Sequence, residues 1–460
     1  MLTGSETSKG IGIGVAKILG LAELSENVST GSVDEFFAAH LKPGTVLVAN
    51  HLTPYMVAKL TDCGVSGFVC ETGGMTSHSA LVARSIGLPA VYGVPNATSV
   101  IKDGDTVIVD GINGFVYERP EAGLIGEFAS RKERYLESRK ELERFCSMKT
   151  VMADSESAQV FCNVNDIVDV MHSIDNGGEG IGLYRTENLF AEFGRAPGEE
   201  EQVRAYSRIA QAMDGHEVVI RTLDIGGDKG LPYIDMELES NPFLGYRAVR
   251  YSLGNREFFA TQLRALLRAS ASGNISIMIP MITCVDEMRE VKALIYELKS
   301  DLRDEGYEYD DNIKVGAMIE TPSAAIISDM LALESDFFSI GTNDLVQYTM
   351  SADRGNRNVA YLQSLTQPAV LRLIKTTIDN AHGAGIPVSV CGEAASDPSL
   401  IPILAGMGCR RFSVNPRSVP EVRRTLSLWS VADAEKYVSD ILKIPSDNEI
   451  KEYMRGAVRI

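Results

Sequence analysis

Short apolar runs recur from about residue 155 to the end of the chain, and each is followed by a stretch of helical periodicity. A short apolar run is typical of a buried strand, and the spacing that follows it is typical of an amphipathic helix. The pattern predicts eight strands: Val160–Val164, Gly182–Arg185, Val218–Thr222, Ile275–Pro280, Val315–Ile319, Phe337–Ile340, Val388–Cys391 and Phe412–Val414. Eight strand–helix units in about 300 residues predict an α/β fold with a TIM (β/α)8 barrel.

The first 120 residues have a pattern that is typical of a compact α/β unit. Strands are predicted at Gly10–Leu19, Thr45–Ala49 and Gly67–Cys70, and a hairpin at residues 106–117 closes the unit. A helix is predicted to begin near Ser77 and to end at Gly87, because glycine is common just past the end of a helix.

Residues 123–150 separate these two regions. The segment is charged, is rich in helix formers and carries apolar residues at helical spacing, so we expect a linker helix. The predicted organisation is therefore an α/β domain at residues 1–122, a helical linker at 123–150 and a barrel at 151–460.

Polar side chains gather at the predicted carboxyl ends of the barrel strands. Such strands are otherwise apolar, and the active sites of these barrels lie at that end. The ring consists of Asn163, Arg185, Glu187, Arg221, Asp224, Glu320, Asn343, Asp344, Cys391, Glu393 and Asn415. Taken singly, each is more commonly a surface ion-pair or turn residue, but their joint position predicts a site.

Arginines and carboxylates at one rim suit an anionic substrate that binds together with a divalent cation. The planar fork of arginine donates paired hydrogen bonds to phosphate or carboxylate. Four arginines are candidates, the last two on predicted insertion loops: Arg185, Arg221, Arg247 and Arg354. Glu320 and Asp344 offer the hard oxygens that Mg²⁺ prefers, since this ion takes one or two carboxylates plus substrate oxygens.

His78 lies in a glycine-rich turn, Gly-Gly-Met-Thr-Ser-His, at residues 73–78. With Ser77 as the N-cap, the imidazole would stand at a helix N-terminus, where free N–H groups and the helix dipole favour a phosphoryl group. A surface histidine that helps to cap a helix is the plainer alternative. The glycine pair favours the phosphoryl-binding interpretation, and we expect the other five histidines to be structural.

Cys391 ends a predicted barrel strand. Most cysteines are small buried hydrophobic residues, but this one faces the proposed substrate. It is therefore a candidate general acid that protonates the carbon of an enolate after the phosphoryl group has left. The other six cysteines are predicted to be structural.

Charge and composition narrow the class of partner. The net charge of −18 argues against nucleic acid, and it means that local arginines must attract any anionic substrate. No apolar run is long enough for a membrane span, and residues 1–10 carry no signal-peptide core. The seven cysteines are scattered without metal-ligand spacing, which predicts a cytoplasmic location.

Seven motifs resemble those of Enzyme I of the bacterial sugar phosphotransferase system and, more broadly, of the phosphoenolpyruvate-utilising enzymes that include pyruvate phosphate dikinase. In chain order they are GGMTSHSALVAR, GIGLYRTE, IRTLDIGGDK, NPFLGYRAVR, MIETPSAA, DFFSIGTNDLVQYTMSADRGN and VCGEAASD. The resemblance runs from about Gly10 to Leu426. The opening GIGIGVAKI favours Enzyme I over the dikinases.

The resemblance implies a role for each matching residue. His78 would be the phosphorylated histidine of a swivelling α/β domain, and Cys391 the acid that acts on the enolate. The substrate ligands would be Arg185, Arg221, Arg247, Asn343 and Arg354, and the magnesium ligands would be Glu320 and Asp344. The resemblance further implies that the phosphoryl group passes from Enzyme I to the carrier protein HPr, and that family members are homodimers through the barrel.

The chain departs from Enzyme I between residues 20 and 44. There Enzyme I inserts a helical bundle that binds HPr, whereas about 25 residues leave room for one or two short helices only. Met75 also stands where Enzyme I more often has arginine. We therefore expect weak or absent transfer to HPr unless another surface or protein supplies docking.

Two other readings remain open at this point. The chain could be a phosphoenolpyruvate synthase or dikinase component, which would need an ATP-binding partner because no suitable glycine-rich nucleotide loop is visible. It could also be a non-enzymatic sensor of phosphoenolpyruvate, although the presence of Cys391 argues against binding alone.

Overall fold

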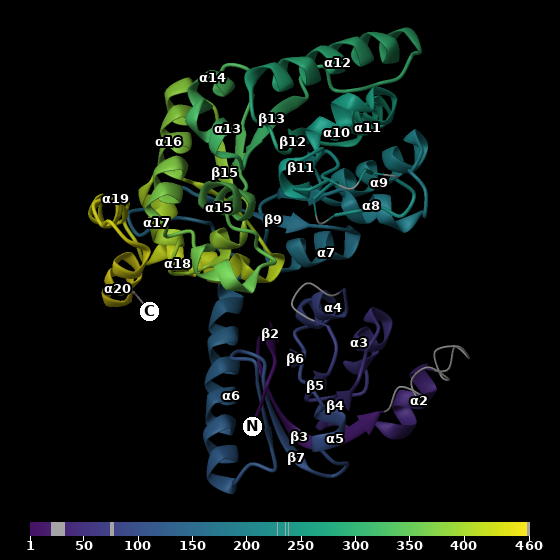
Figure 1. Cartoon of the computed structure of the whole chain (residues 1–460), viewed down its shortest axis with the longest axis vertical. Helices are drawn as coiled ribbons and strands as arrows, with labels where there is room; N and C mark the ends of the chain where they lie inside the picture. Colours follow the sequence, from purple (N-terminus) through teal and green to yellow (C-terminus); the bar gives the residue numbers. More distant parts are fainter. Residues whose placement is uncertain (20–32, 74–77, 228, 235, 238, 458–460) are drawn as a thin grey trace. The chain divides into compact units, whose positions relative to one another are not determined.

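The computed structural model describes residues 1–19, 33–73, 78–227, 229–234, 236–237 and 239–457. The chain divides into two compact units, Met1–Glu141 and Leu142–Ile460 (Figure 1).

The first unit is built on an eight-stranded sheet in the order β1-β8-β7-β3-β4-β5-β6-β2. The strands are β1 (Leu2–Thr3), β2 (Ser5–Ser8), β3 (Ile11–Leu19), β4 (Thr45–Ala49), β5 (Gly67–Cys70), β6 (Ala90–Tyr92), β7 (Thr106–Asp110) and β8 (Phe115–Glu118). The central strands β3 to β6 pair in parallel, and the outer pairs are antiparallel. The carboxyl ends of β4 and β5 therefore open on one edge, which is where ligand-binding loops of parallel sheets lie.

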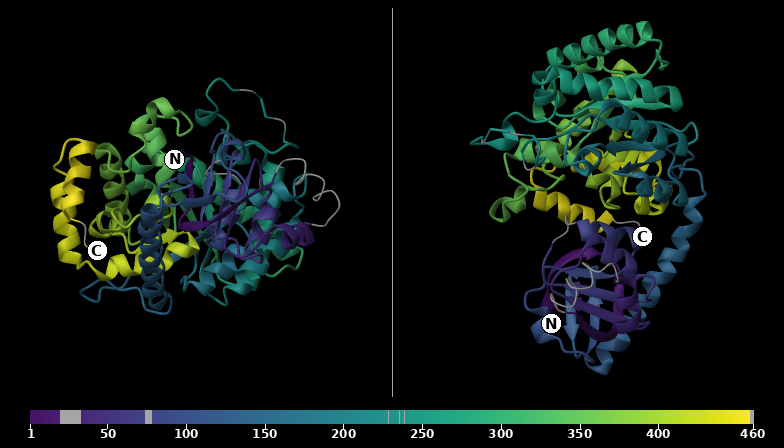
Figure 2. Two further views of the ribbon diagram at one scale, coloured as in Figure 1. Left: turned by 90° about the horizontal axis from the view of Figure 1, so that it is seen from below. Right: turned by 90° about the vertical axis from the view of Figure 1, so that its right-hand side faces the viewer.

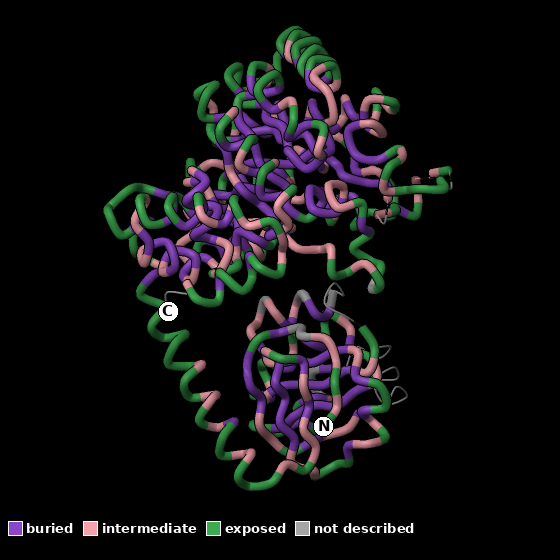
Figure 3. The backbone as a smooth tube through the Cα atoms, turned by 60° about the vertical axis from the view of Figure 1, so that its left-hand side comes forward, coloured by how far each residue is buried: buried purple, intermediate pink, exposed green. Residues whose placement is uncertain are grey.

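Helices cover both faces of this sheet. They are α2 (Val33–His40), α3 (Pro54–Leu60), α4 (His78–Ile86), α5 (Ala97–Val100) and α6 (Ala122–Glu143). One apolar cluster joins the sheet to α2, α3 and α4, and a second joins the opposite face to α5. Phe128 of α6 packs with Ile11 and Ile108 in a third cluster. The helix predicted at 123–150 thus ends at Glu143, and its second half is largely exposed (Figure 3).

The second unit is a closed barrel of parallel strands. The strands are β9 (Gln159–Val164), β10 (Ile181–Arg185), β11 (Val218–Arg221), β12 (Ile275–Ile279), β13 (Lys314–Ile319), β14 (Phe338–Ile340), β15 (Val388–Val390) and β16 (Arg411–Val414). Strand β16 pairs with β9 and closes the ring. The predicted fold class is confirmed, because every predicted barrel strand lies within a residue or two of an observed one.

Helices surround the barrel, as the views in Figure 2 show. They are α7 (Ile167–Asp175), α8 (Glu187–Glu192), α9 (Glu199–Ala212), α10 (Val249–Gly254), α11 (Arg256–Ala269), α12 (Val285–Asp304), α13 (Pro322–Ile326), α14 (Ser328–Ala332), α15 (Thr342–Met350), α16 (Pro368–Ala384), α17 (Ile401–Gly406), α18 (Val419–Ser427), α19 (Val431–Ile441) and α20 (Asp447–Ala457). Together with the strands they bury one large apolar core. In the parts of the chain that the structure describes, no helix is long and apolar enough to cross a membrane.

Three strands of the first unit were not predicted: β1, β2 and β6. Strand β2 has the sequence Ser-Glu-Thr-Ser, which lacks the apolar alternation of a typical strand. It forms at the sheet edge by antiparallel pairing with β6, so tertiary pairing rather than local pattern decides its conformation.

Candidate active site

A cavity of about 250 Å³ opens at the carboxyl ends of the barrel strands. Its lining is mostly polar, although the strands below are apolar. The lining residues come from the ends of six strands, β9, β10, β11, β13, β14 and β15, and from two insertions: Asn165, Leu183, Arg185, Glu187, Asn188, Arg221, Lys229, Met318, Glu320, Gly341, Thr342, Asn343, Asp344, Arg354, Cys391 and Gly392. Eight of the nine site residues predicted from the sequence belong to the barrel, and seven of these eight line this cavity.

Two arginines line the cavity at the ends of β10 and β11. Arg221 ends β11 and is nearly buried; its guanidinium pairs with Glu187 and lies 3.4 Å from Asp224. Arg185 ends β10, and its Nη1 donates to Asn165 Oδ1 at 3.4 Å. Burial, and after it the charge of Arg221, lowers the pKa of Arg185. A cation in such surroundings favours an anionic ligand, which would offset both the burial and the repulsion.

Glu320 and Asp344 line the other side of the cavity, at the ends of β13 and β14. Both side chains are buried. Glu320 Oε1 accepts a hydrogen bond from the backbone N–H of Met281 at 2.7 Å. Burial, together with the charges of Asp344 and Asp224, raises the pKa of Glu320 to about 8. A divalent cation between Glu320 and Asp344 would remove this repulsion, so the pair fits a hard metal ion such as Mg²⁺.

The described residues hold no cluster of three or more histidine, cysteine or acidic side chains placed for a metal. Two carboxylates are nonetheless sufficient for Mg²⁺, which usually completes its octahedral coordination with waters and substrate oxygens. Each carboxylate has one oxygen engaged with the protein, Oε1 of Glu320 and Oδ1 of Asp344. The donor set thus fits an ion that binds jointly with a phosphorylated substrate.

Arg247 is placed differently from the other three arginines. It is fully buried and does not belong to the cavity lining. Its Nε and Nη2 donate to the two oxygens of Asp224 at 2.9 and 3.0 Å, and its Nη1 donates to Asp344 Oδ1 at 2.8 Å. In this structure Arg247 therefore bridges two carboxylates beneath the site, and a direct substrate contact stays a prediction.

Asp224 balances the cations around it. Burial alone would raise the pKa of this carboxyl group, but Lys229, Arg221 and Arg247 hold it well below its usual value. Asp224 is consequently ionised, and it fixes three cationic side chains at once.

Cys391 follows β15, and its thiol lines the cavity. Its Sγ lies 3.5 Å from the carbonyl oxygen of Ile340. Burial raises the pKa of this thiol, so it stays protonated at neutral pH. A protonated group beside the cavity has the form that a general acid requires.

Asn343 and Arg354 complete the lining predicted from the sequence. Asn343 lies in the first turn of α15, immediately before Asp344. Arg354 lies in the loop after α15, where its backbone N–H donates to Gln347 Oε1 at 3.2 Å. Both side chains are exposed at the mouth, where a ligand would enter.

His78 is the first residue of α4, which follows β5 in the α/β unit. The helix begins within one residue of the predicted position. The predicted cap Ser77 and the rest of the turn at 74–77 lie outside the described residues, and so does the side chain of His78.

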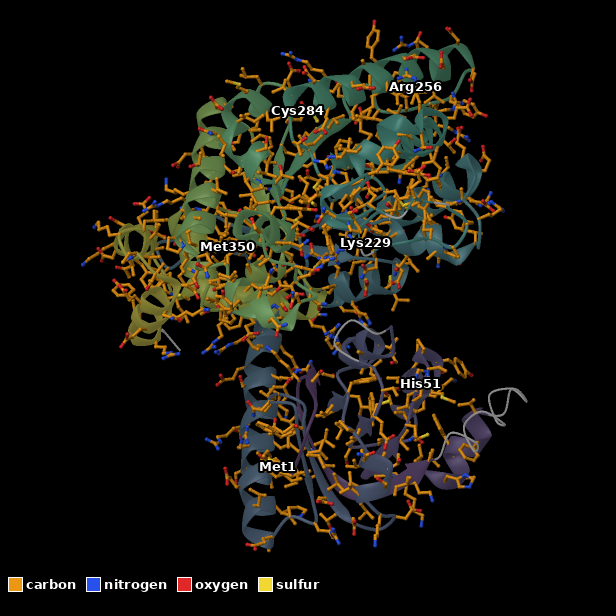
Figure 4. The ribbon with its side chains drawn as sticks, in the orientation of Figure 1. Met1, His51, Lys229, Arg256, Cys284 and Met350 are labelled. Atoms are coloured by element: carbon orange, nitrogen blue, oxygen red, sulfur yellow. The ribbon has the colours of Figure 1, made fainter. Side chains whose placement is uncertain are left out.

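The lining also contains polar residues that were not predicted, among them Asn165, Asn188 and Lys229. Lys229 ends the motif IRTLDIGGDK, and its Nζ lies 2.5 Å from Asp224 Oδ2 (Figure 4). The available signal was the glycine pair Gly226–Gly227 between Asp224 and Lys229. Both glycines have positive φ values, 106° and 68°, and this turn brings the lysine back over the barrel.

Two family models match the chain. The "PEP-utilising enzyme, PEP-binding domain" matches residues 139–430, and the "PEP-utilising enzyme, mobile domain" matches residues 41–114. The first covers the barrel and its mouth, and the second covers the region around His78. The chain therefore belongs to the family of phosphoenolpyruvate-utilising enzymes.

Within this family the chain is similar to phosphoenolpyruvate-protein phosphotransferases. It is 46% identical to that of Bacillus subtilis over 410 residues, which is 89% of this chain and 72% of the relative. It is 45% identical to that of Priestia megaterium and 43% identical to that of Staphylococcus carnosus, covering 90% of this chain and 72% and 73% of the two relatives. The resemblance to Enzyme I is thus confirmed. The incomplete coverage of the relatives is consistent with a missing HPr-binding subdomain.

Proposed function

We propose that this chain is a phosphoenolpyruvate-protein phosphotransferase that transfers the phosphoryl group of phosphoenolpyruvate to its own His78. The observation that carries the proposal is the cavity in which Arg185 and Arg221 face Glu320 and Asp344. Phosphoenolpyruvate carries a phosphate and a carboxylate, and two arginine forks beside a carboxylate pair suit that combination with Mg²⁺.

In the proposed reaction, the bond between phosphorus and the enol oxygen breaks as a bond forms between phosphorus and a ring nitrogen of His78. Arg185, Arg221 and Arg354 hold the substrate and stabilise the charge of the transferring group. Glu320 and Asp344 would hold Mg²⁺, which would supply neutralisation of the phosphate charge. The leaving enolate takes a proton at carbon from the Cys391 thiol, which gives pyruvate, and solvent returns the proton to the thiolate.

The experiment is incubation of the purified chain with Mg²⁺ and phosphoenolpyruvate labelled on phosphorus. We expect acid-labile, base-stable label on the wild type and none on His78→Ala. His216→Ala is the matched control, because His216 is an exposed histidine in the barrel unit. Label on His78→Ala would contradict the assignment of the phosphorylated residue. A wild type that binds phosphoenolpyruvate without becoming labelled would favour the sensor reading instead.

Chelation tests the metal part of the proposal in the same assay. With excess EDTA, labelling of the wild type should fall to background, and added Mg²⁺ should restore it. Full labelling in EDTA would contradict the role proposed for Glu320 and Asp344.

The phosphoryl acceptor in this proposal is a cytoplasmic phosphocarrier protein of the HPr type. Helix α2 is the only helix described between residues 20 and 44, and it has eight residues. Because residues 20–44 are too few for the docking bundle of Enzyme I, we expect transfer from phospho-His78 to HPr to saturate only at high HPr concentration. Rapid transfer at low concentration would show that another surface supplies docking.

We further propose that the chain forms a homodimer through the barrel. Ile326 ends α13, Met330 lies in α14 and Leu333 directly follows α14, and these three side chains are 64%, 56% and 80% exposed. Large apolar side chains gathered in this way are typical of a protein interface. Sedimentation should give a dimer for the wild type, whereas Met330→Glu with Leu333→Glu should give a monomer.

A further inference from the structure

A tyrosine outside the cavity connects two parts of the proposed substrate site. Tyr348 lies in α15, one helical turn after the candidate metal ligand Asp344. Its side chain is partly buried and does not line the cavity. Any effect on substrate must therefore pass through residues that do.

The phenol oxygen of Tyr348 has two partners that fit its hydrogen-bonding capacity. Its single proton is donated to the carbonyl oxygen of Phe243, at 2.5 Å. It accepts a hydrogen bond from Arg247 Nη1, at 3.1 Å. Because arginine can only donate and a carbonyl can only accept, these directions are fixed without any choice of rotamer.

The two partners lead to opposite sides of the site. The same Nη1 of Arg247 also donates to Asp344 Oδ1, at 2.8 Å. Phe243, in the short helix Pro242–Leu244, carries the guanidinium of Arg354 over its ring, with the Cζ atom 5.9 Å from the ring centroid. That distance is within the range of an attractive cation–π contact.

The Phe243 ring is also closely packed from below. A Cβ atom on Gly227 would lie 3.0 Å from the Cδ1 atom of Phe243, so the absence of a side chain there allows the contact. The ring therefore has a defined place between the turn at Gly226–Gly227 and Arg354. A hydrogen bond to the backbone carbonyl of Phe243 therefore suffices to fix the ring on which the guanidinium of Arg354 lies.

We infer that Tyr348 is a positioning residue for phosphoenolpyruvate: its phenol oxygen fixes Phe243, the platform of Arg354, to Arg247 and thereby to Asp344. The inference rests on the proposed function, since Arg354 is taken to contact the substrate. Helix α15 would then hold Arg354 at two points, at its backbone through Gln347 and at its guanidinium through Tyr348 and Phe243.

The test is a set of equilibrium binding measurements on the full chain, with phosphoenolpyruvate and saturating Mg²⁺ in a calorimeter. Loss of one hydrogen bond to a charged network corresponds to about a tenfold change in affinity, so Tyr348→Phe should weaken binding by about tenfold. The rate of His78 labelling at saturating phosphoenolpyruvate should stay within about twofold of wild type, since the reacting groups are unchanged. Tyr361→Phe, at a residue that is 73% exposed, is the matched control.

A double-mutant cycle separates this route from a general structural effect. In an Arg354→Ala background, Tyr348→Phe should cause no further loss of affinity, because both changes remove the same contact. Phe243→Leu should reproduce the effect of Tyr348→Phe, and it provides the test if Tyr348→Phe fails to fold. The inference would be overturned, and the proposed function left intact, if Tyr348→Phe lowered affinity equally in the wild-type and Arg354→Ala backgrounds. Wild-type affinity in both Tyr348→Phe and Phe243→Leu would have the same consequence. A wild type that does not bind phosphoenolpyruvate would overturn the proposed function and the inference together.

Discussion

The two units of this chain supply chemistry in different ways. The barrel brings charges from distant parts of the sequence into one cavity; Arg247 and Asp344, for example, are 97 residues apart and lie 2.8 Å from each other. The α/β unit offers one histidine at the start of α4, in a short local motif. The cavity of the barrel is therefore a property of the whole fold, whereas the proposed histidine site is specified by a few consecutive residues.

This difference has an energetic consequence. Removing one charge from the barrel network leaves other buried charges without a partner, which is costly. A change in the α/β unit that spares His78 should affect only the stability of that unit. The following predictions test this contrast, from the largest expected effect to the smallest.

Arg221→Ala should have the largest effect. It removes a proposed substrate ligand and leaves Glu187 and Asp224 with one cation fewer, so affinity for phosphoenolpyruvate should fall at least about a hundredfold, or roughly 3 kcal/mol. Arg221→Lys should recover only part of this, because an ammonium group lacks the planar fork. Calorimetric titration measures both. Arg256→Ala is the control, since Arg256 (Figure 4) and its partner Glu297 are both exposed. A similar loss of affinity in Arg256→Ala would contradict a special role for the charges of the cavity.

Asp344→Asn should raise the Mg²⁺ concentration that half-supports phosphoenolpyruvate binding by about tenfold or more. The amide keeps an oxygen but loses the charge that a hard divalent cation requires. A magnesium titration at fixed phosphoenolpyruvate measures the shift. Asp329→Asn is the control, because Asp329 is exposed and its substitution should leave the magnesium titration unchanged. If Asp344→Asn also leaves the titration unchanged, Asp344 is not a magnesium ligand.

Cys391 should be alkylated slowly at neutral pH. The thiolate is the reactive form, and burial raises the pKa of this thiol, so the thiol form persists in the folded protein. Alkylation by iodoacetamide should therefore accelerate only as pH rises past the ordinary thiol value of about 8.5. Peptide mapping by mass spectrometry compares Cys391 with the partly exposed Cys284. Equal rates for the two at pH 7 would contradict a buried, protonated Cys391.

Asp110→Asn in the α/β unit should have the smallest effect on substrate. Asp110 is fully buried and accepts hydrogen bonds from Asn113 Nδ2 at 2.7 Å, from the backbone of Ile112 and from Arg131 of α6. Weakening these bonds should cost about 1–2 kcal/mol of stability. Thermal unfolding measures this, with the exposed Asp62→Asn as control. Phosphoenolpyruvate affinity should not change. A loss of affinity would contradict the expectation that a change in the α/β unit leaves substrate binding by the barrel unaffected.

Local patterns were sufficient for the elements that are long or strongly apolar. The barrel strands follow from their apolar runs, and the helix that begins at His78 follows from its flanking glycines. The strands β1, β2 and β6 were missed because each has only two to four residues, which is too short to establish a periodic pattern. Lys229 was missed because its position depends on a turn with positive φ values rather than on a periodicity.

The sequence by itself determined the fold class, the succession of the barrel strands along the chain and which residue types stand at their carboxyl ends, because apolar periodicity and the sequence of elements are local properties of the chain. Only the tertiary structure decided which of those residues are buried in ion pairs and which are exposed in the cavity. It buried Arg247 between Asp224 and Asp344 while leaving Arg354 at the mouth, and it joined the two through Tyr348 and Phe243. Closure of the barrel sets these long-range distances, and the burial that follows determines which charges must pair.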